Sequence, residues 1–127
     1  QPGFKPHERM TKQVGKFSFG RRPTLDVVAT PMGTYQAIVY RAIGEQWYRQ
    51  CDLNRDLIVT GTVRIRILIN KNGKISSMRQ TSRVGASEVQ KSFTFLAIKL
   101  ARLPAMPPEV RSMLVGDSLE MYFDFNF

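Results

Sequence analysis

The sequence has one cysteine, Cys51, and one histidine, His7, in 127 residues. A single cysteine cannot form an internal disulfide, and this pair of residues cannot supply a cluster of soft metal ligands. We interpret Cys51, in the run Trp47 to Cys51, as a partly buried small hydrophobe and not a reactive thiol. We expect His7 to be a solvated residue of a polar tail.

The sequence also lacks the residue sets that enzymes use. Its only histidine lies in the tail, so no Ser/His/Asp set is present, and Gly73 and Gly85 lack the spacing of a phosphate-binding loop. Glu120 and Asp124 would stand about 13 Å apart on one strand face, too far for a glycosidase pair. These absences predict a protein that is not an enzyme and uses no cofactor and no metal.

No apolar stretch is long enough to span a membrane, and no signal peptide is recognisable. The chain begins at Gln1 and not at a methionine, which indicates a fragment or a mature product, so we expect any anchor to lie upstream. Acidic residues are few, with 10 Asp+Glu against 19 Lys+Arg and a net charge of +9. This charge suits nucleic acid, a lipid surface or an acidic protein, and does not choose among them.

The final nine residues alternate between large apolar and mostly polar side chains. A period of two predicts a strand. Its apolar face would carry Leu119, Met121, Phe123, Phe125 and Phe127, and its other face Glu120, Tyr122, Asp124 and Asn126. A terminal strand is a candidate sheet edge, whose unpaired N–H and C=O groups are either protected or used to recruit an extended partner segment.

The first part of the chain predicts a tail followed by a helix. Residues 1–33 are rich in Pro, Gly, Lys and Arg and indicate a basic linker or tail, with one short extended piece at Thr24 to Ala29. Apolar residues then recur at helical spacing, which predicts a helix over 34–50 with Thr34 as its N-cap.

The remainder predicts a hairpin, a second helix and the final strand. Thr60 to Ile69 alternates like a strand, the turn of residues 70–73 reverses the chain, and Lys74 to Thr81 returns. Ser87 and Gln90 have capping-box spacing before a helix that we expect to end near Leu103. The sequence thus predicts an α+β fold in residues 34–127: a two-layer, three-stranded antiparallel sheet with two helices packed on one face, in the order α-β-β-α-β.

This arrangement resembles the C-terminal domain of the TonB/TolA energy transducers over about 34–127. The likeness rests on Tyr35 with the first helix, Gly61 to Ile65, Asn72 to Ile75, the Pro-x-Met-Pro-Pro spacing of residues 104–108 and the aromatic final strand. The tail departs from the family because it lacks a long proline-rich spacer, and the loop of residues 81–85 matches its counterpart loosely.

The resemblance implies the periplasmic domain of an inner-membrane-anchored protein. Such a domain binds an extended segment of an outer-membrane receptor by strand addition and couples inner-membrane energy to transport. It reaches inner-membrane motor proteins through an N-terminal anchor. Carried over by position, the partner-binding residues are Pro31, Met32, Gly33, Leu119, Glu120, Met121, Tyr122, Phe123, Asp124, Phe125, Asn126 and Phe127. Arg64, Arg66 and Arg79 would attract an acidic partner segment.

Two other hypotheses remain open. A small basic nucleic-acid-binding module would use the net charge with Phe17, Phe19, Arg21 and Arg22, although the leading hypothesis expects no nucleic acid. A structural envelope domain would instead form a homodimer by pairing its final strands.

Overall fold

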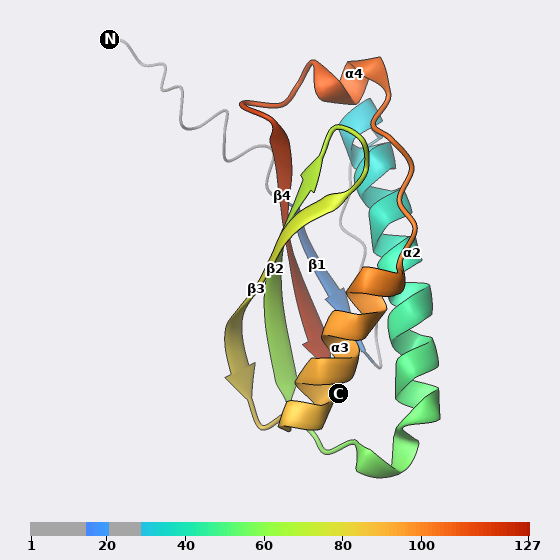
Figure 1. Ribbon diagram of the computed structural model, residues 1–127, viewed down its shortest axis with the longest axis vertical. Helices are drawn as coiled ribbons and strands as arrows, with labels where there is room; N and C mark the ends of the chain where they lie inside the picture. Colours follow the sequence, from blue (N-terminus) through green and yellow to red (C-terminus); the bar gives the residue numbers. More distant parts are fainter. Residues whose placement is uncertain (1–14, 21–28) are drawn as a thin grey trace, which may run out of the picture.

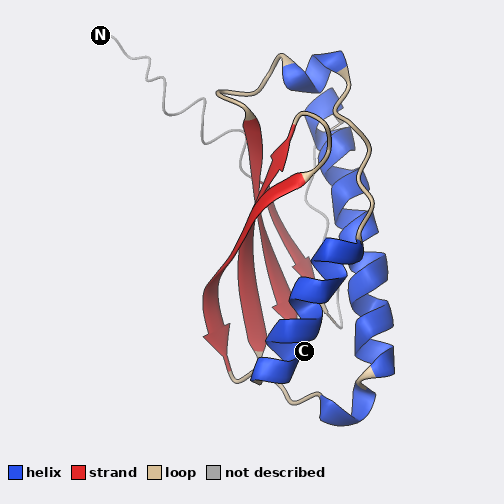
Figure 2. Ribbon diagram, in the orientation of Figure 1, coloured by secondary structure: helices blue, strands red, loops and turns tan. Residues whose placement is uncertain are grey.

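The computed structural model describes residues 15–20 and 29–127. In this part of the chain, the two long helices lie on the same side of one sheet (Figures 1 and 2). The helices are α2 (Pro31–Leu53), α3 (Glu88–Leu100) and the short α4 (Pro108–Arg111), with a 3₁₀ turn at Arg55–Leu57. The predicted α+β class is confirmed.

The sheet is mixed and has four strands. They are β1 (Gly15–Phe19), β2 (Thr62–Asn70), β3 (Ile75–Val84) and β4 (Ser118–Asn126), in the spatial order β1-β4-β2-β3. β2 pairs antiparallel with β3 and with β4, whereas β1 pairs parallel with β4. The final strand therefore lies inside the sheet.

The predicted three-stranded antiparallel sheet is wrong because β1, from the predicted tail, adds a fourth strand in parallel. The segment was missed because only Phe17 and Phe19 are large and apolar, and because its pairing partner lies at the other end of the chain. The order α-β-β-α-β holds for the long elements after β1. The extended piece predicted at Thr24 to Ala29 lies outside the described residues except for Ala29, which is in a bend.

The helix ends follow local side-chain chemistry. α2 begins at Pro31, earlier than predicted, and Thr30 is its N-cap in place of Thr34, because the Thr30 hydroxyl accepts a hydrogen bond from the Gly33 N–H at 2.9 Å. Proline is tolerated at a first helical position, where its missing N–H has no partner to lose. The capping box of Ser87 and Gln90 is confirmed at the start of α3.

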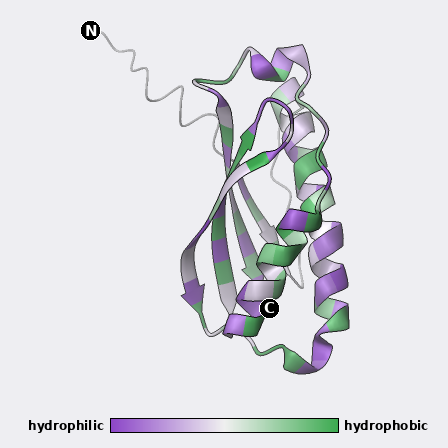
Figure 3. Ribbon diagram, in the orientation of Figure 1, coloured by the Kyte–Doolittle hydropathy of each residue, from purple (hydrophilic) through white to green (hydrophobic). Residues whose placement is uncertain are grey.

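The core forms between the helices and the inner face of the sheet. On β4, the side chains of Leu119, Met121, Phe123 and Phe125 are fully buried. The alternation of hydrophobic and hydrophilic residues along the strands is visible in Figure 3. Burial of this apolar surface is the main force that holds β4 against α2 and α3. In the described ranges, no helix combines the length and the apolar character needed to cross a membrane.

Cys51 packs against this core from the last turns of α2 and is partly exposed, as predicted. Burial, and to a lesser degree the nearby Asp52 carboxylate, raises the pKa of its thiol to about 12. The thiolate is the reactive form, so the folded protein holds Cys51 in its inert state at neutral pH.

We predict that native Cys51 reacts with a disulfide reagent at pH 8 at least about 100-fold more slowly than in the unfolded chain, where a thiol titrates near pH 8.5. Because the folded pKa is raised, the stability that the thiol contributes is present below about pH 8.5 and is lost as pH rises towards 12. Thiol-reactivity kinetics with and without denaturant measure the difference. Equal rates in the two states would contradict it.

Candidate strand-binding site

β4 has a hydrogen-bonded neighbouring strand on each of its two edges, although we expected one edge to be free. β1 pairs with it from Gly15 opposite Met121 to Phe19 opposite Phe125. β2 pairs along its other edge, from Thr62 opposite Asn126 to Asn70 opposite Ser118. The expectation of a free flank over residues 121–125 is therefore wrong, because the chain supplies its own extended segment there.

Three side chains bind the main chain of β1 and of the residue after it. The Tyr40 hydroxyl donates to the Ser18 carbonyl at 3.0 Å, and the Asn126 side-chain amide donates to the Phe19 carbonyl at 2.9 Å. The Tyr48 hydroxyl donates to the Gly20 carbonyl at 2.8 Å and accepts from the Gly20 N–H at 3.0 Å. These contacts involve only backbone atoms of the bound segment, so they do not depend on its side chains.

Alternate side chains of β1 enter the core. Phe17 and Phe19 are 3% and 1% exposed. The Phe19 ring stacks on Tyr40 with 4.5 Å between ring centroids and on Phe125 with 5.1 Å. A Cβ atom at Gly44 would lie 2.7 Å from the Phe19 ring, so glycine leaves the room that this ring occupies. Specificity for large apolar residues at every second position follows from these contacts.

We give the name β1 slot to six residues of α2 and β4 that contact β1 or the residue after it: Tyr40, Gly44, Tyr48, Phe123, Phe125 and Asn126. The three residues from α2 have i, i+4, i+8 spacing, which puts them on one face of the helix. Burial, followed by the neighbouring Tyr48, raises the pKa of Tyr40. Its hydroxyl therefore stays protonated and remains a hydrogen-bond donor at neutral pH.

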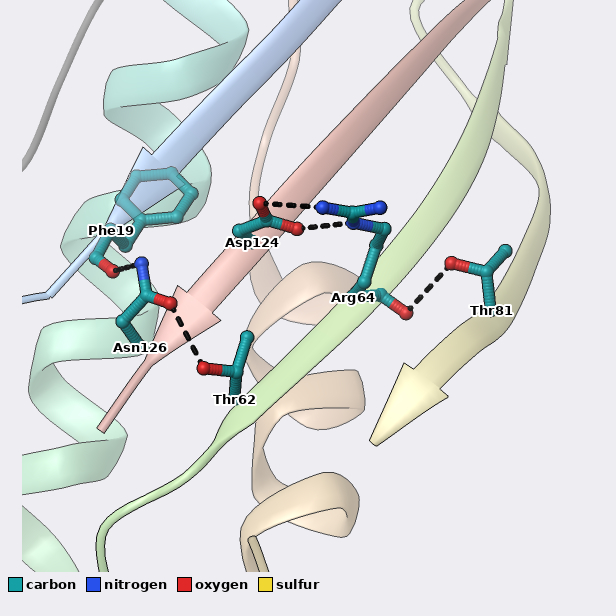
Figure 4. Close-up of polar contacts among 6 residues, drawn as sticks. All are labelled: Phe19, Thr62, Arg64, Thr81, Asp124 and Asn126. Carbon is teal, nitrogen blue, oxygen red and sulfur yellow. Dashed lines mark hydrogen bonds and ion pairs between the residues drawn. The ribbon is translucent and has the colours of Figure 1, made fainter. Parts of the chain in front are cut away.

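The outer face of the sheet is joined by polar side chains across all four strands (Figure 4). Asn126 donates to Phe19 of β1 and accepts from the Thr62 hydroxyl of β2. Arg64 forms a two-bond ion pair with Asp124, and the Thr81 hydroxyl of β3 donates to the Arg64 carbonyl. The hydrogen bond to Asp124 raises the pKa of Arg64, so this cation is already paired.

Arg66 is paired as well, with Glu120. Two of the three arginines that we expected to attract an acidic partner segment thus bind carboxylates of β4 instead. Their physical role is to fix the register of β2 against β4, because opposite charges on neighbouring strands stabilise the pairing. Arg79 is exposed and has no carboxylate partner among the described residues.

The predicted partner-binding residues fall into three groups. Leu119, Met121, Phe123 and Phe125 are core, and Phe127 is partly buried; Glu120, Tyr122, Asp124 and Asn126 lie on the outer face. Met32 and Gly33 are buried in α2. Pro31 is exposed and lines a shallow groove beside Pro104 and Pro107, and β1 does not border that groove.

The sequence-based prediction missed Tyr40, Tyr48 and the segment Gly15–Phe19. One signal was present: Phe17 and Phe19 flank Ser18 at period two, which is strand spacing. The buried rings of these phenylalanines are not free to stack on bases, which removes the aromatic part of the nucleic-acid hypothesis. Arg21 and Arg22 lie outside the described residues.

No family model matches the chain, and no curated protein matches it. Within residues 15–20 and 29–127, no three His, Cys, Asp or Glu side chains are grouped to hold a metal ion. The β1 slot binds an extended backbone segment of this chain.

We predict that Tyr48→Phe weakens the attachment of β1 without unfolding the domain. The change removes both hydrogen bonds to Gly20 while keeping the ring, and each such bond contributes about 1 kcal/mol. The protected amides of Gly15–Phe19 should exchange with solvent about 5 to 30 times faster, as measured by hydrogen-exchange NMR.

Tyr35→Phe is the matched control, because it removes a tyrosine bond to the Pro104 carbonyl, remote from β1. Its β1 amides should exchange within about twofold of the unchanged protein. Equal acceleration in both variants would show that Tyr48 does not hold β1 specifically.

Proposed function

We propose that this domain binds an extended segment of a partner protein by strand exchange, in which the segment takes the place of β1 beside β4. The observation that carries the proposal is the β1 slot itself. Its polar side chains form hydrogen bonds with the carbonyl groups of three successive residues, 18–20. Its apolar side chains surround Phe17 and Phe19, which occupy alternate positions of β1. Strand addition uses the same two elements: backbone hydrogen bonds for affinity and alternate pockets for selectivity.

Exchange is favoured over simple addition by the chemistry of the site. A partner that replaces β1 would recover the hydrogen bonds and the apolar burial that β1 gives up, so the two states differ little in contacts. A partner added outside β1 would gain backbone hydrogen bonds but would have no access to the aromatic recess, because Phe17 and Phe19 fill it. The exchange mode therefore gives the larger selectivity.

Competition from β1 sets the apparent affinity of the partner segment for the β1 slot. Because β1 belongs to the same chain, it competes at an effective concentration that is in the millimolar range for short tethers. The partner binds only the fraction of molecules in which the slot is open, and its apparent dissociation constant rises accordingly. A moderate affinity that responds to the stability of β1 follows from this competition.

The physiological role that we propose is that of the periplasmic C-terminal domain of a TonB-like energy transducer. The partner segment would belong to an outer-membrane receptor, and an upstream membrane anchor would connect the domain to inner-membrane motor proteins. Support comes from the element order after β1, the proline-rich stretch before α4 and the position of β4 beside an extended segment. The proposal involves binding and mechanical coupling and no catalysis.

The test is a titration of the ¹⁵N-labelled chain with N-terminal segments of outer-membrane receptors encoded by the same organism. We expect chemical-shift changes at Gly15–Phe19 and at residues 121–125. The Phe19→Ala variant should bind at least about tenfold more tightly, because loss of a buried phenylalanine weakens β1 by up to about 3–5 kcal/mol while the partner supplies its own side chain.

Phe93→Ala is the control, since it removes a buried ring of α3 that does not contact β1. It should lower stability without a gain in affinity. Addition outside β1 predicts the opposite sign for Phe19→Ala, namely weaker binding. Chemical-shift changes confined to other parts of the sheet would contradict the proposal.

A further inference from the structure

A second surface lies at the opposite edge of the sheet, between the start of β3 and the end of α3. It is a groove of about 430 Å³. Ile75 and Met78 of β3 and Leu103 of the segment after α3 line it, and each is partly buried against the core. These residues give the groove an apolar wall, and its volume is large enough for one bulky side chain.

The rim of this groove carries positive charges that no described carboxylate neutralises. Lys74, Lys99 and Arg102 line it, and all three are exposed. None of them forms an ion pair with a described carboxylate, whereas Arg64, Arg66 and Arg83 elsewhere do. The described lining includes no aspartate or glutamate. An occupant with negative charge is therefore favoured electrostatically.

The backbone of β3 indicates how an occupant would bind. β3 is an edge strand, but its pairing with β2 is interrupted at two bulges, where Ser76 and Thr81 have no register partner. Bulges twist an edge away from regular pairing and protect it against addition of a long strand. The groove is therefore suited to capture of a side chain and not to strand addition.

We propose that this groove binds a short acidic segment of a partner protein, with one large apolar side chain against the apolar wall and flanking carboxylates on Lys74, Lys99 and Arg102. The groove lies at the β3 edge of the sheet and the β1 slot at the opposite edge, and β2 separates β3 from β4. The two surfaces can therefore be occupied together. This inference does not depend on the function proposed above.

The test uses the full ¹⁵N-labelled chain and three blocked peptides: Glu-Asp-Leu-Asp-Glu, the neutral Gln-Asn-Leu-Asn-Gln, and Glu-Asp-Gly-Asp-Glu without the apolar side chain. We expect the first peptide to shift the amides of Ile75, Met78 and Leu103. We expect it to bind at least tenfold more tightly than either of the others. None of these peptides has two apolar residues at alternate positions, so a negative result here leaves the β1 slot untested and the two proposals fail separately.

Two triple variants with the same net charge separate the site from general attraction. Lys74→Gln/Lys99→Gln/Arg102→Gln should weaken binding at least tenfold. Arg41→Gln/Arg49→Gln/Arg111→Gln removes three exposed cations outside the groove. This variant should change the affinity for the peptide less than twofold. Comparable weakening by both triple variants would overturn the proposal.

Two further probes test whether the groove binds a lipid surface or a nucleic acid instead of a peptide. Vesicles of anionic phosphatidylglycerol and a random 20-nucleotide DNA strand are titrated under the same conditions. We expect neither to compete for the groove amides at the peptide's concentration. Tighter binding of either one at these residues would overturn a peptide as the occupant. A fall in thermal stability of the first triple variant without loss of peptide binding would also overturn it, because the cations would then serve only the end of α3.

Discussion

The structure depends on the position of β4 as an internal strand with one fully apolar face. Leu119, Met121, Phe123 and Phe125 are completely buried, and the strand has hydrogen-bonded neighbours on both edges. A shift of register by one residue would turn every one of these side chains to the solvent face. The ion pairs of Arg64 with Asp124 and of Arg66 with Glu120 fix the same register from the outer side. The helix layer and the position of β1 follow from this strand.

The same constraint explains why β1 resembles a bound ligand. It is short and parallel, it lies against a strand that is already complete on its other edge, and much of its binding comes from two phenylalanine rings and from side chains that hold its backbone. A segment from another protein with the same spacing would meet the same groups. The β3 edge differs, because two bulges interrupt it and cations surround its groove. The sheet thus binds an extended segment beside β4, whereas the bulged edge of β3 disfavours pairing with one.

The sequence predicted the elements whose apolar period is long and uninterrupted. α2, β2, α3 and β4 were all expected near their observed positions, because periodicity extends over many residues and the caps have characteristic residues, as at Ser87 and Gln90. The failures concern contacts between distant parts of the chain. β1 has only two large apolar residues, and its pairing with β4 joins the two ends of the sequence. Tyr40 and Tyr48 were consequently assigned to a helix without a site, because their partners were not known to be nearby.

The most direct test of the β1 slot uses the variant Phe17→Ala/Phe19→Ala and a peptide that copies residues 15–20, Gly-Lys-Phe-Ser-Phe-Gly. Intermolecular nuclear Overhauser effects would locate the peptide rings, and a peptide of the same composition with adjacent phenylalanines is the control. The account predicts contacts from the peptide's second phenylalanine ring to Tyr40 and Phe125, with the peptide parallel to β4 and the control peptide bound at least about tenfold more weakly, since only alternate positions share one strand face. Equal binding of both peptides, or contacts to Ile75 and Met78 instead, would contradict it.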